Sequence, residues 1–171
     1  MSGNAGATMR VRPMEARDRD AVIEMLTSSD PWARLGYTRV DWLTAFRPLP
    51  EAREAYVAVL GEEVAGLAVV RPAYMLGDYL NLLVVAEAHR SHGVGACLIE
   101  HVERIVFARA KNFFVCVSDF NAAARRFYAR QGYEEVGVLR DLIVEGASEI
   151  LLRKTSGPLR VPAPPETVSR N

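Results

Sequence analysis

The sequence predicts an α/β (α+β) fold in which a mixed central sheet carries helices on both faces. Two pairs of apolar segments are joined by short glycine-containing turns, a pattern typical of hairpins and therefore of antiparallel strands. A third passage, residues 79–117, has the pattern of a strand, a long amphipathic helix and a second strand, which is typical of a crossover between parallel strands. The chain of 171 residues, 50% apolar and 25% charged, has the size and composition of one globular domain.

The first part of the chain is expected to contain one strand and two helices. Residues 9–12 are the strand candidate. Residues 18–27 follow as a helix, because Val22 and Leu26 recur on one face with helical spacing. Residues 30–46 are rich in aromatic side chains, and we expect a second, shorter helix within them.

A hairpin and a single buried strand come next. Residues 55–60 and 64–70 are expected to be strands, joined by a turn that contains Gly61. Residues 79–85 read as a continuous apolar run, which predicts a strand buried on both faces.

The longest predicted helix covers residues 93–110. Leu98, Val102 and Ile105 fall on its inner side with helical spacing. Another buried strand is expected at residues 113–117.

The last helix and a final hairpin complete the predicted domain. Residues 122–131 form a helix that begins after Asn121 and ends before Gly132, since asparagine is a preferred N-cap and glycine a preferred terminator. Residues 136–144 and 148–153 are expected to pair as antiparallel strands.

Composition restricts the classes of function. Acidic and basic residues balance at 21 each, so no overall field attracts nucleic acid or an anionic membrane. No apolar run is long enough to span a bilayer, and the first residues lack the pattern of a signal peptide. Cys97 and Cys116 are isolated, with no His/Cys cluster at metal-ligand spacing, which favours buried thiols in a reducing cytoplasm and no metal. Residues 1–8 and 156–171 are expected to be tails, the second rich in proline, around a domain of residues 9–155.

The glycine turn, Arg90-Ser91-His92-Gly93-Val94-Gly95-Ala96, is the strongest functional signal in the chain. It joins an apolar strand to the start of a long helix, where unpaired backbone N–H groups and the helix dipole attract phosphate oxygens. A dinucleotide motif would need a third glycine where Leu98 stands, and a nucleoside-triphosphate loop would need Gly-Lys followed by Ser or Thr. Neither occurs, so the turn either binds another phosphate ligand or is a plain loop-to-helix turn.

A second block, Asn121…Ala124…Phe127-Tyr128…Gly132-Tyr133, follows the glycine turn by one helix and one strand. Arg90-x-x-Gly93-x-Gly95-Ala96 resembles the Arg/Gln-x-x-Gly-x-Gly/Ala motif for acetyl-coenzyme A of the Gcn5-related N-acetyltransferase (GNAT) superfamily. The second block resembles the strand-and-helix block that follows this motif in the family, and the element order over residues 9–154 fits throughout. The resemblance implies the GNAT fold, a mixed sheet of six to seven strands with helices on both faces, whose parallel central strands splay apart for the cofactor.

The resemblance also implies where acetyl-coenzyme A would bind. The backbone N–H groups of the glycine turn would hold its pyrophosphate, and the preceding strand would pair with its pantetheine arm. Asn121 would hydrogen-bond that arm, or serve as a plain helix cap, or do both. The expected cofactor-binding residues are Leu83, Val84, Val85, Arg90, Ser91, His92, Gly93, Val94, Gly95, Ala96, Asn121 and Tyr128.

By the same resemblance, Tyr128 occupies the family's general-acid position. A phenol could protonate the departing thiolate, since the ordinary pKa is about 8.5 for a thiol and about 10 for a tyrosine. Its alternative role is packing on the inner helix face with Ala124 and Phe127. Some family members carry a catalytic glutamate near the start of the strand before the glycine turn, where this chain has Tyr79. Asp78 is the candidate base, and deprotonation through water is the alternative.

Together these inferences predict an acetyl-coenzyme A-dependent N-acetyltransferase that moves an acetyl group to a primary amine by direct attack. The sequence does not identify the amine, which a small molecule or a peptide could carry. No nucleic acid or membrane partner is expected, and a homodimer is left open. The alternative is a non-catalytic coenzyme A-binding module of the same fold, which the absent strand glutamate favours and Tyr128 disfavours.

Overall fold

The computed structural model describes residues 8–47 and 52–160 and contains the expected order of elements. Of the two tails expected from the sequence, residues 1–7 and 161–171 lie outside the described residues. The strands are β1 (Met9–Pro13), β2 (Glu54–Leu60), β3 (Glu63–Tyr74), β4 (Gly77–Val85), β5 (Asn112–Ser118), β6 (Glu134–Arg140) and β7 (Ser148–Thr155). The helices are α1 (Arg19–Thr27), α2 (Arg39–Ala45), α3 (Val94–Arg109) and α4 (Ala122–Arg130), with 3₁₀ turns η1 (Ala16–Asp18) and η2 (Glu87–His89).

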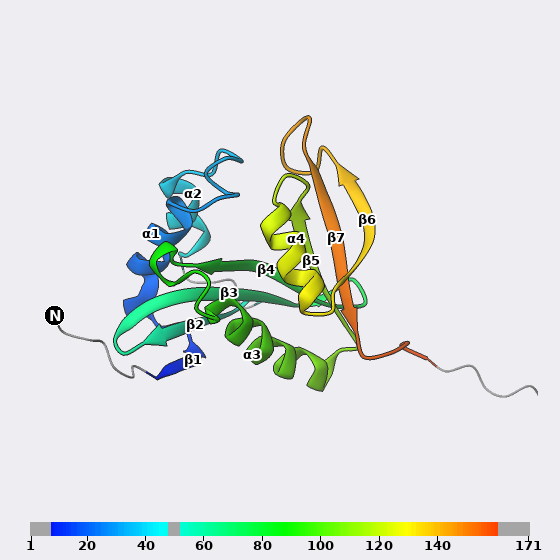
Figure 1. Cartoon of the computed structure of the whole chain (residues 1–171), viewed down its shortest axis with the longest axis horizontal. Coiled ribbons are helices and arrows are strands. Elements are labelled where there is room, and N and C mark those ends of the chain that lie inside the picture. The colour runs from blue at the N-terminus through cyan, green and yellow to red at the C-terminus, as the bar shows by residue number, and fades with distance from the viewer. Residues whose placement is uncertain (1–7, 48–51, 161–171) are drawn as a thin grey trace, which may run out of the picture.

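One seven-stranded sheet, with the order β1-β2-β3-β4-β5-β7-β6, runs through the molecule (Figure 1). Every neighbouring pair is antiparallel except β4 and β5, which are parallel and are joined through α3. The mixed sheet with a strand–helix–strand crossover is therefore confirmed. In Figure 1, β5, β6 and β7 run steeply across β1–β4, so the sheet is strongly twisted.

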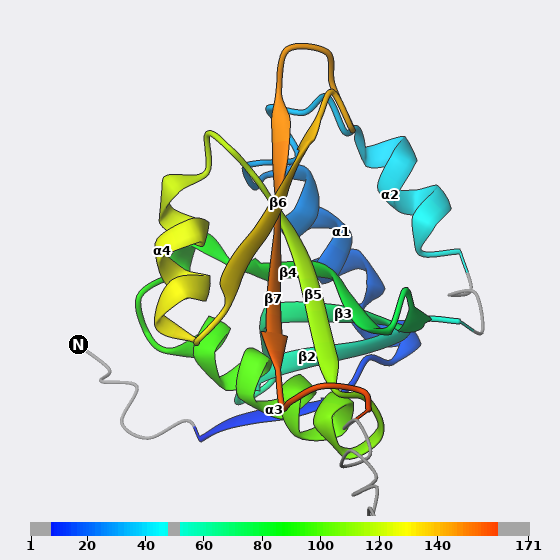
Figure 2. The same ribbon diagram turned by 90° about the vertical axis from the view of Figure 1, so that its right-hand side faces the viewer.

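Helices cover both faces of the sheet, as predicted (Figure 2). A hydrophobic core lies on each face of the sheet, because successive side chains of a strand point to opposite faces. Val57 and Leu67 face α1 and α2, whereas Ala58 and Ala68 face α3. Each large aliphatic side chain buried in this way contributes about 1.5–3 kcal/mol relative to an exposed one. No helix within residues 8–47 and 52–160 has both the length and the apolar character needed to cross a membrane.

A β-bulge at Asn81 interrupts β4. Val69 pairs with Leu82 and Val70 pairs with Leu80, so Asn81 is an extra residue without a partner on β3. Because of this insertion, Leu80 packs on the α3 side of the sheet and Leu82 on the α1 side, although both have the same parity in the sequence.

The parallel ladder between β4 and β5 ends at the bulge. Its registered pairs are Asp78–Phe113, Tyr79–Phe114 and Leu80–Val115. Beyond Leu80 the two strands diverge, which confirms the splay implied by the family resemblance. We call residues 77–80 the closed half of β4 and residues 81–85 its open half.

Burial along β4 differs from the sequence-based prediction. The apolar run predicts burial on both faces, but Leu82 and Val84 are buried while Leu83 and Val85 are only partly buried. The reason is the splay, which leaves the face of Leu83 and Val85 lining cavities instead of packing on a neighbouring strand.

Two further predictions were wrong in detail. In α3, Val106 rather than Ile105 continues the fully buried stripe. The strand predicted over residues 136–144 ends at Arg140, because Asp141 adopts a left-handed φ of 53° and its Oδ1 accepts a hydrogen bond from the Gly146 N–H at 2.7 Å. Residues 141–147 therefore form a loop between β6 and β7.

Candidate active site

The glycine turn enters α3 through two left-handed residues, Ser91 with a φ of 65° and Gly93 with a φ of 81°. Glycine adopts this conformation without a Cβ clash, which explains its use at the N-cap of α3. The first helical hydrogen bond runs from the Cys97 N–H to the Gly93 carbonyl at 3.0 Å. The N–H groups of Val94, Gly95 and Ala96 therefore precede the helical hydrogen-bond ladder and are free to bind a ligand.

A cavity of about 510 Å³, here called the turn cavity, lies over this helix start, between the glycine turn and α4. Among the described residues its lining contains Arg90 and Arg130 and no carboxylate, and the first turn of α3 has no acidic residue. A Cβ built on Gly95 would lie 3.5 Å from the Phe127 ring, so only a small residue here keeps the cavity open. Free N–H groups, the helix dipole and two guanidinium groups together favour an anion.

Two more cavities continue from the turn cavity along the splayed strands. The middle cavity, of about 350 Å³, lies between residues 30–34 and residues 120–123. The splay cavity, of about 370 Å³, has its floor on residues 79–83 of β4 and residues 115–118 of β5. Leu83 lines all three cavities, and Tyr128 lines both the turn cavity and the splay cavity. The three spaces therefore form one path from the helix start to the gap between the parallel strands.

Most of the predicted binding residues lie on this path. Val84 lines the middle cavity, but its side chain packs into the core beneath α1. His92 lines none of the three cavities. It lies between the left-handed residues Ser91 and Gly93 and is exposed to solvent. The predicted residues that line at least one cavity are Leu83, Val84, Val85, Arg90, Ser91, Gly93, Val94, Gly95, Ala96, Asn121 and Tyr128.

Tyr128 combines the two roles that the sequence left open. Its ring packs edge-on against Phe127 and Tyr133, with centroid separations of 5.1 and 5.4 Å, and the residue is only 5% exposed. It nevertheless lines two cavities, at the point where they approach each other. Burial raises the pKa of the Tyr128 phenol, so the hydroxyl stays protonated and can act as a proton donor.

Asn121 caps α4, as predicted. Its Oδ1 accepts a hydrogen bond from the Ala124 N–H at 3.1 Å. The residue also lines the middle and splay cavities. Because the cap uses the carbonyl oxygen, the side-chain NH₂ group can donate to a ligand in these cavities.

Asp78, the candidate base, does not lie with the other predicted residues. It belongs to the closed half of β4, is only 2% exposed, and lines none of the three cavities. Its Oδ2 accepts from Arg109 Nε at 2.7 Å and its Oδ1 accepts from the Ala73 N–H at 3.0 Å, while Arg109 also binds Glu54. Both carboxylate oxygens are thus already bonded and outside the cavities, so the structure does not favour Asp78 as the base, and removing one partner of such a buried pair is destabilising.

The splay cavity contains polar side chains that the sequence did not single out. Glu149 on β7 lines it, is 5% exposed, and accepts a hydrogen bond from Ser118 Oγ at 2.7 Å. Tyr79 and Cys116 line the same cavity, and burial raises the pKa of each. One glutamate within an apolar strand was the only sequence signal for Glu149, and such a residue usually faces solvent.

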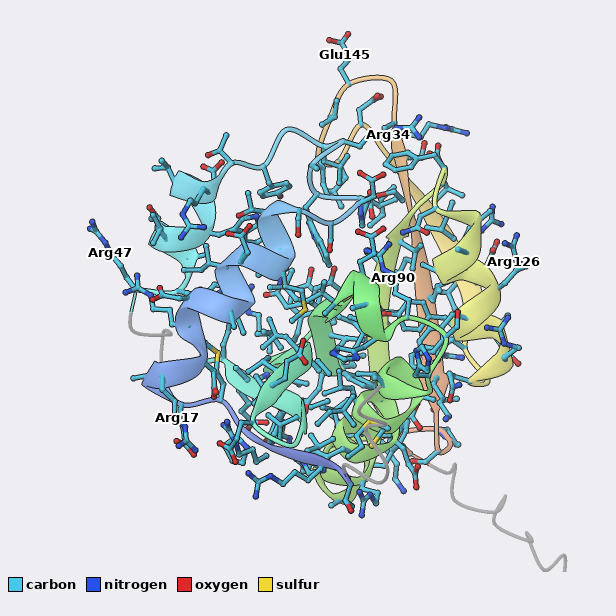
Figure 3. All side chains as sticks on the ribbon, turned by 60° about the vertical axis from the view of Figure 1, so that its left-hand side comes forward. Arg17, Arg34, Arg47, Arg90, Arg126 and Glu145 are labelled. Atoms are coloured by element: carbon cyan, nitrogen blue, oxygen red, sulfur yellow. The ribbon has the colours of Figure 1, made fainter. Side chains whose placement is uncertain are left out.

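The two open sides of the path are walled by segments far apart in the sequence. Residues 30–37 bring Trp32 and Tyr37 to the splay cavity, and the loop between β6 and β7 brings Leu142 and Ile143. The first wall is held by the Arg34 guanidinium, whose Cζ lies 4.0 Å from the centroid of the Phe120 ring. Figure 3 shows Arg34 and Glu145, from the two opposing walls, at the same end of the molecule.

Comparison with known proteins decides the family. A profile described as Acetyltransferase (GNAT) family matches residues 19–133, which is more than half of the 171 residues. The chain belongs to the GNAT acetyltransferase family. It is therefore an enzyme of the N-acetyltransferase class, and the fold expected from the glycine turn and the Asn121 block is confirmed.

Solved structures share the fold of this acetyltransferase at low sequence identity. The ribosomal-protein-S18-alanine N-acetyltransferase from Escherichia coli is 15% identical, with 91% of this chain and 100% of that chain covered and a TM-score of 0.74. Ard1 from Thermoplasma volcanium is 20% identical, with 86% and 97% covered and a TM-score of 0.73. An aminoglycoside 6'-N-acetyltransferase complexed with coenzyme A is 20% identical, with 89% and 99% covered and a TM-score of 0.70. No curated protein matches the sequence.

Proposed function

We propose that this acetyltransferase uses acetyl-coenzyme A and acetylates a primary amine by direct attack on the thioester. The observation that carries the proposal is the continuous path from the start of α3 to the gap between β4 and β5, with Tyr128 facing both ends of it. The coenzyme A complex of the related aminoglycoside acetyltransferase supports the choice of cofactor.

The residues of the path fit the parts of coenzyme A. The free N–H groups of Val94, Gly95 and Ala96, together with Arg90, would bind the pyrophosphate. The unpaired edge of β4 at Leu83 and Val85 offers backbone N–H and C=O groups to the two amides of the pantetheine arm, since β5 no longer pairs with β4 there. Arg90 also ties the glycine turn to the segment that follows α1, because its Nη2 donates a hydrogen bond to Ser29 Oγ at 3.4 Å.

Tyr128 would protonate the sulfur of coenzyme A as it leaves. The raised pKa keeps the phenol neutral at physiological pH, as a proton donor requires. A thiolate in the same buried space is also poorly solvated, so its pKa rises too and the two groups remain matched for proton transfer.

An acyl-cysteine intermediate is disfavoured by the state of the thiol in the splay cavity. Burial raises the pKa of Cys116, and the charge of Glu149 raises it further. The thiol therefore stays protonated and is a poor nucleophile. Direct attack by the amine needs no such group.

The test compares Tyr128→Phe with Tyr133→Phe. Both tyrosines are 5% exposed, but only Tyr128 lines the path. With acetyl-coenzyme A and a panel of amines, release of free thiol should fall about 10²-fold or more in Tyr128→Phe, the usual size of a general-acid contribution. Coenzyme A affinity, measured by calorimetry, should change little in either variant, and Tyr133→Phe should keep its rate.

Three outcomes would contradict the proposal. An unchanged rate in Tyr128→Phe would remove the general-acid role. Coenzyme A binding by the unaltered protein without turnover of any amine would favour the non-catalytic module. Thermal stabilisation by ATP or NAD and none by coenzyme A would contradict the cofactor itself.

A further inference from the structure

Glu149 is a buried carboxylate that lacks a cationic partner. Its Oε1 accepts the Ser118 hydrogen bond at 2.7 Å. Within residues 8–47 and 52–160, no lysine, arginine or histidine nitrogen lies within 4.0 Å of its carboxylate. The other two buried carboxylates of this region are both paired, Asp18 with Arg12 at 2.6 Å and Asp78 with Arg109 at 2.7 Å.

Such an arrangement is costly for the folded protein alone. A buried charge without a counter-ion is destabilising, and proteins normally pair it or expose it. Burial and the nearby Asp119 charge raise the pKa of Glu149, whereas the Ser118 hydrogen bond lowers it. A cationic ligand entering the splay cavity would supply the missing partner.

The rest of the splay cavity indicates what kind of cation fits. Its two walls present Trp32, Tyr37, Leu142 and Ile143, which are apolar or aromatic. Among the described residues, the charged members of the lining are Glu149, Asp30 and Arg53. Asp30 and Arg53 carry opposite charges, so the lining has one net negative charge among apolar walls, which matches a single ammonium group on an apolar body. A polycation would bring more positive charge than this lining balances.

We propose that Glu149 binds the ammonium group of the acceptor amine and removes its proton, and that the acceptor carries one amine on an aliphatic or aromatic body. This assignment rests on the proposed acetyl transfer. It places the base on β7, across the splay cavity from the strand where the sequence led us to expect it.

Every proton that moves in this reaction has a donor and an acceptor. The R–NH₃⁺ group gives one proton to the Glu149 carboxylate, and the neutral nitrogen attacks the thioester carbonyl carbon. When the intermediate collapses, the C–S bond breaks and the electron pair goes to sulfur, which takes the Tyr128 proton. The nitrogen sheds its second proton, which restores the Tyr128 phenol, and Glu149 releases its proton to solvent. The products are the acetamide, free coenzyme A thiol and one proton.

Several groups surround Glu149 and bear on the pH dependence of the reaction. Ser118 at the end of β5 and Asp119 directly after it lie near the carboxylate, and Leu139 is the registered partner on β6. Tyr79 from β4, Cys116 from β5 and Tyr128 from α4 share the cavity and have raised pKa values, so they remain neutral below pH 7. Asp30 belongs to the far wall. We expect the acidic limb of kcat/KM to report deprotonation of Glu149, and the response of this limb to Ser118→Ala distinguishes Glu149 from Asp30 and Asp119.

The experiment uses Glu149→Gln, Ser118→Ala and the control Glu103→Gln in the full chain. Glutamine keeps an oxygen that can accept from Ser118, so the fold is preserved while the charge is lost. Glu103 is a partly buried carboxylate, with a side chain 14% exposed, but it pairs with Lys154 and lies outside the three cavities. We expect kcat/KM for 2-phenylethylamine to fall about 10²-fold or more in Glu149→Gln. The coenzyme A affinity of Glu149→Gln should be unchanged. The control Glu103→Gln should keep both its coenzyme A affinity and its kcat/KM.

Ser118→Ala tests whether Glu149 acts as a base, because a purely structural role of Glu149 would not change the pH dependence of kcat/KM. Removing a donor that stabilises the charged carboxylate raises the pKa of Glu149, so the acidic limb of kcat/KM should shift to higher pH. If the limb stays where it is and Glu149→Gln keeps its rate while the unaltered protein turns over, only the role of Glu149 is overturned. If the unaltered protein turns over no amine, the proposed acetyl transfer itself fails.

Substrate class is tested with 2-phenylethylamine, spermidine and an aminoglycoside as acceptors. The apolar monoamine should have a kcat/KM at least about tenfold above either polycation, which corresponds to one unpaired charge at the cavity. A preference for spermidine or for the aminoglycoside would overturn the assignment of an apolar monoamine acceptor.

Discussion

The closed half of β4 and its open half differ in their neighbours far more than in their own residues. In the closed half, Asp78 is fixed by Arg109, and a Cβ added to Gly77 would overlap the Asn112 carbonyl group, so the strand is packed to contact. In the open half, Leu83 and Val85 face cavities, because β5 has diverged after the bulge at Asn81. The buried carboxylate of the closed half therefore serves stability, whereas the residues of the open half are placed to contact a ligand.

The comparison also explains why the candidate base was misplaced. Position along a strand suggests Asp78, but its carboxylate is already neutralised by an arginine. Within the part of the chain that the structure describes, the buried carboxylate without a cationic partner comes from β7, whose Glu149 is the registered partner of Ser118 on β5. What distinguishes a reactive carboxylate is the absence of a counter-ion inside a cavity, and only the folded arrangement reveals that absence.

The largest effect is expected from Asp78→Ala, which tests the closed half. Loss of the buried carboxylate leaves Arg109 partly desolvated and the Ala73 N–H unpaired, and should lower the free energy of unfolding by about 3 kcal/mol. Urea unfolding measures this, with Glu24→Ala as a control, because the Glu24–Arg39 pair is exposed and should contribute under about 1 kcal/mol. The rate per folded molecule should not change. A lost rate at unchanged stability would return Asp78 to the list of catalysts.

Gly95→Leu should have the next largest effect and tests the turn cavity beside the open half. The added side chain would enter the space next to Phe127 and exclude the cofactor. We expect coenzyme A binding about 100-fold weaker, or about 2.7 kcal/mol, by calorimetry. Gly137→Leu is the matched control, since a Cβ there meets nothing within 4 Å and β6 is at the sheet edge. Equal affinities in the two variants would mean that the cofactor does not lie over the start of α3.

The smallest effect is expected from Arg90→Gln. Arg90 is exposed, so its contribution to pyrophosphate binding should be about 1 kcal/mol, or roughly fivefold in affinity, at low salt. The loss should shrink in concentrated salt, because exposed charges are screened. Arg126→Gln removes the same charge from the solvent side of α4, where Figure 3 shows the side chain pointing outward, and should leave affinity unchanged. A loss that is independent of salt would assign Arg90 a packing role through Ser29 instead.

Much of the fold and half of the site could be predicted from the residues alone. The glycine turn, the cap at Asn121 and the inner face of α3 depend on contacts within a few positions, and their patterns are therefore legible in the sequence. The strand–helix–strand passage predicted a parallel pair, and the structure contains it. Contacts between residues close in the sequence thus determined the part of the path at the start of α3.

The other end was decided only by the tertiary structure. One extra residue at Asn81 changes which face of β4 each later side chain occupies, and composition carries no sign of such an insertion. The Ser118–Glu149 hydrogen bond joins residues 31 positions apart, and the register of β5 on β7 places it in the splay cavity. The sequence by itself determined the family and the glycine turn to which we assign pyrophosphate binding, because both depend on short-range backbone geometry. The packing of distant strands gives Asp78 an arginine partner and leaves Glu149 without a cationic one among the described residues. A carboxylate's reactivity depends on the charges that the fold places beside it.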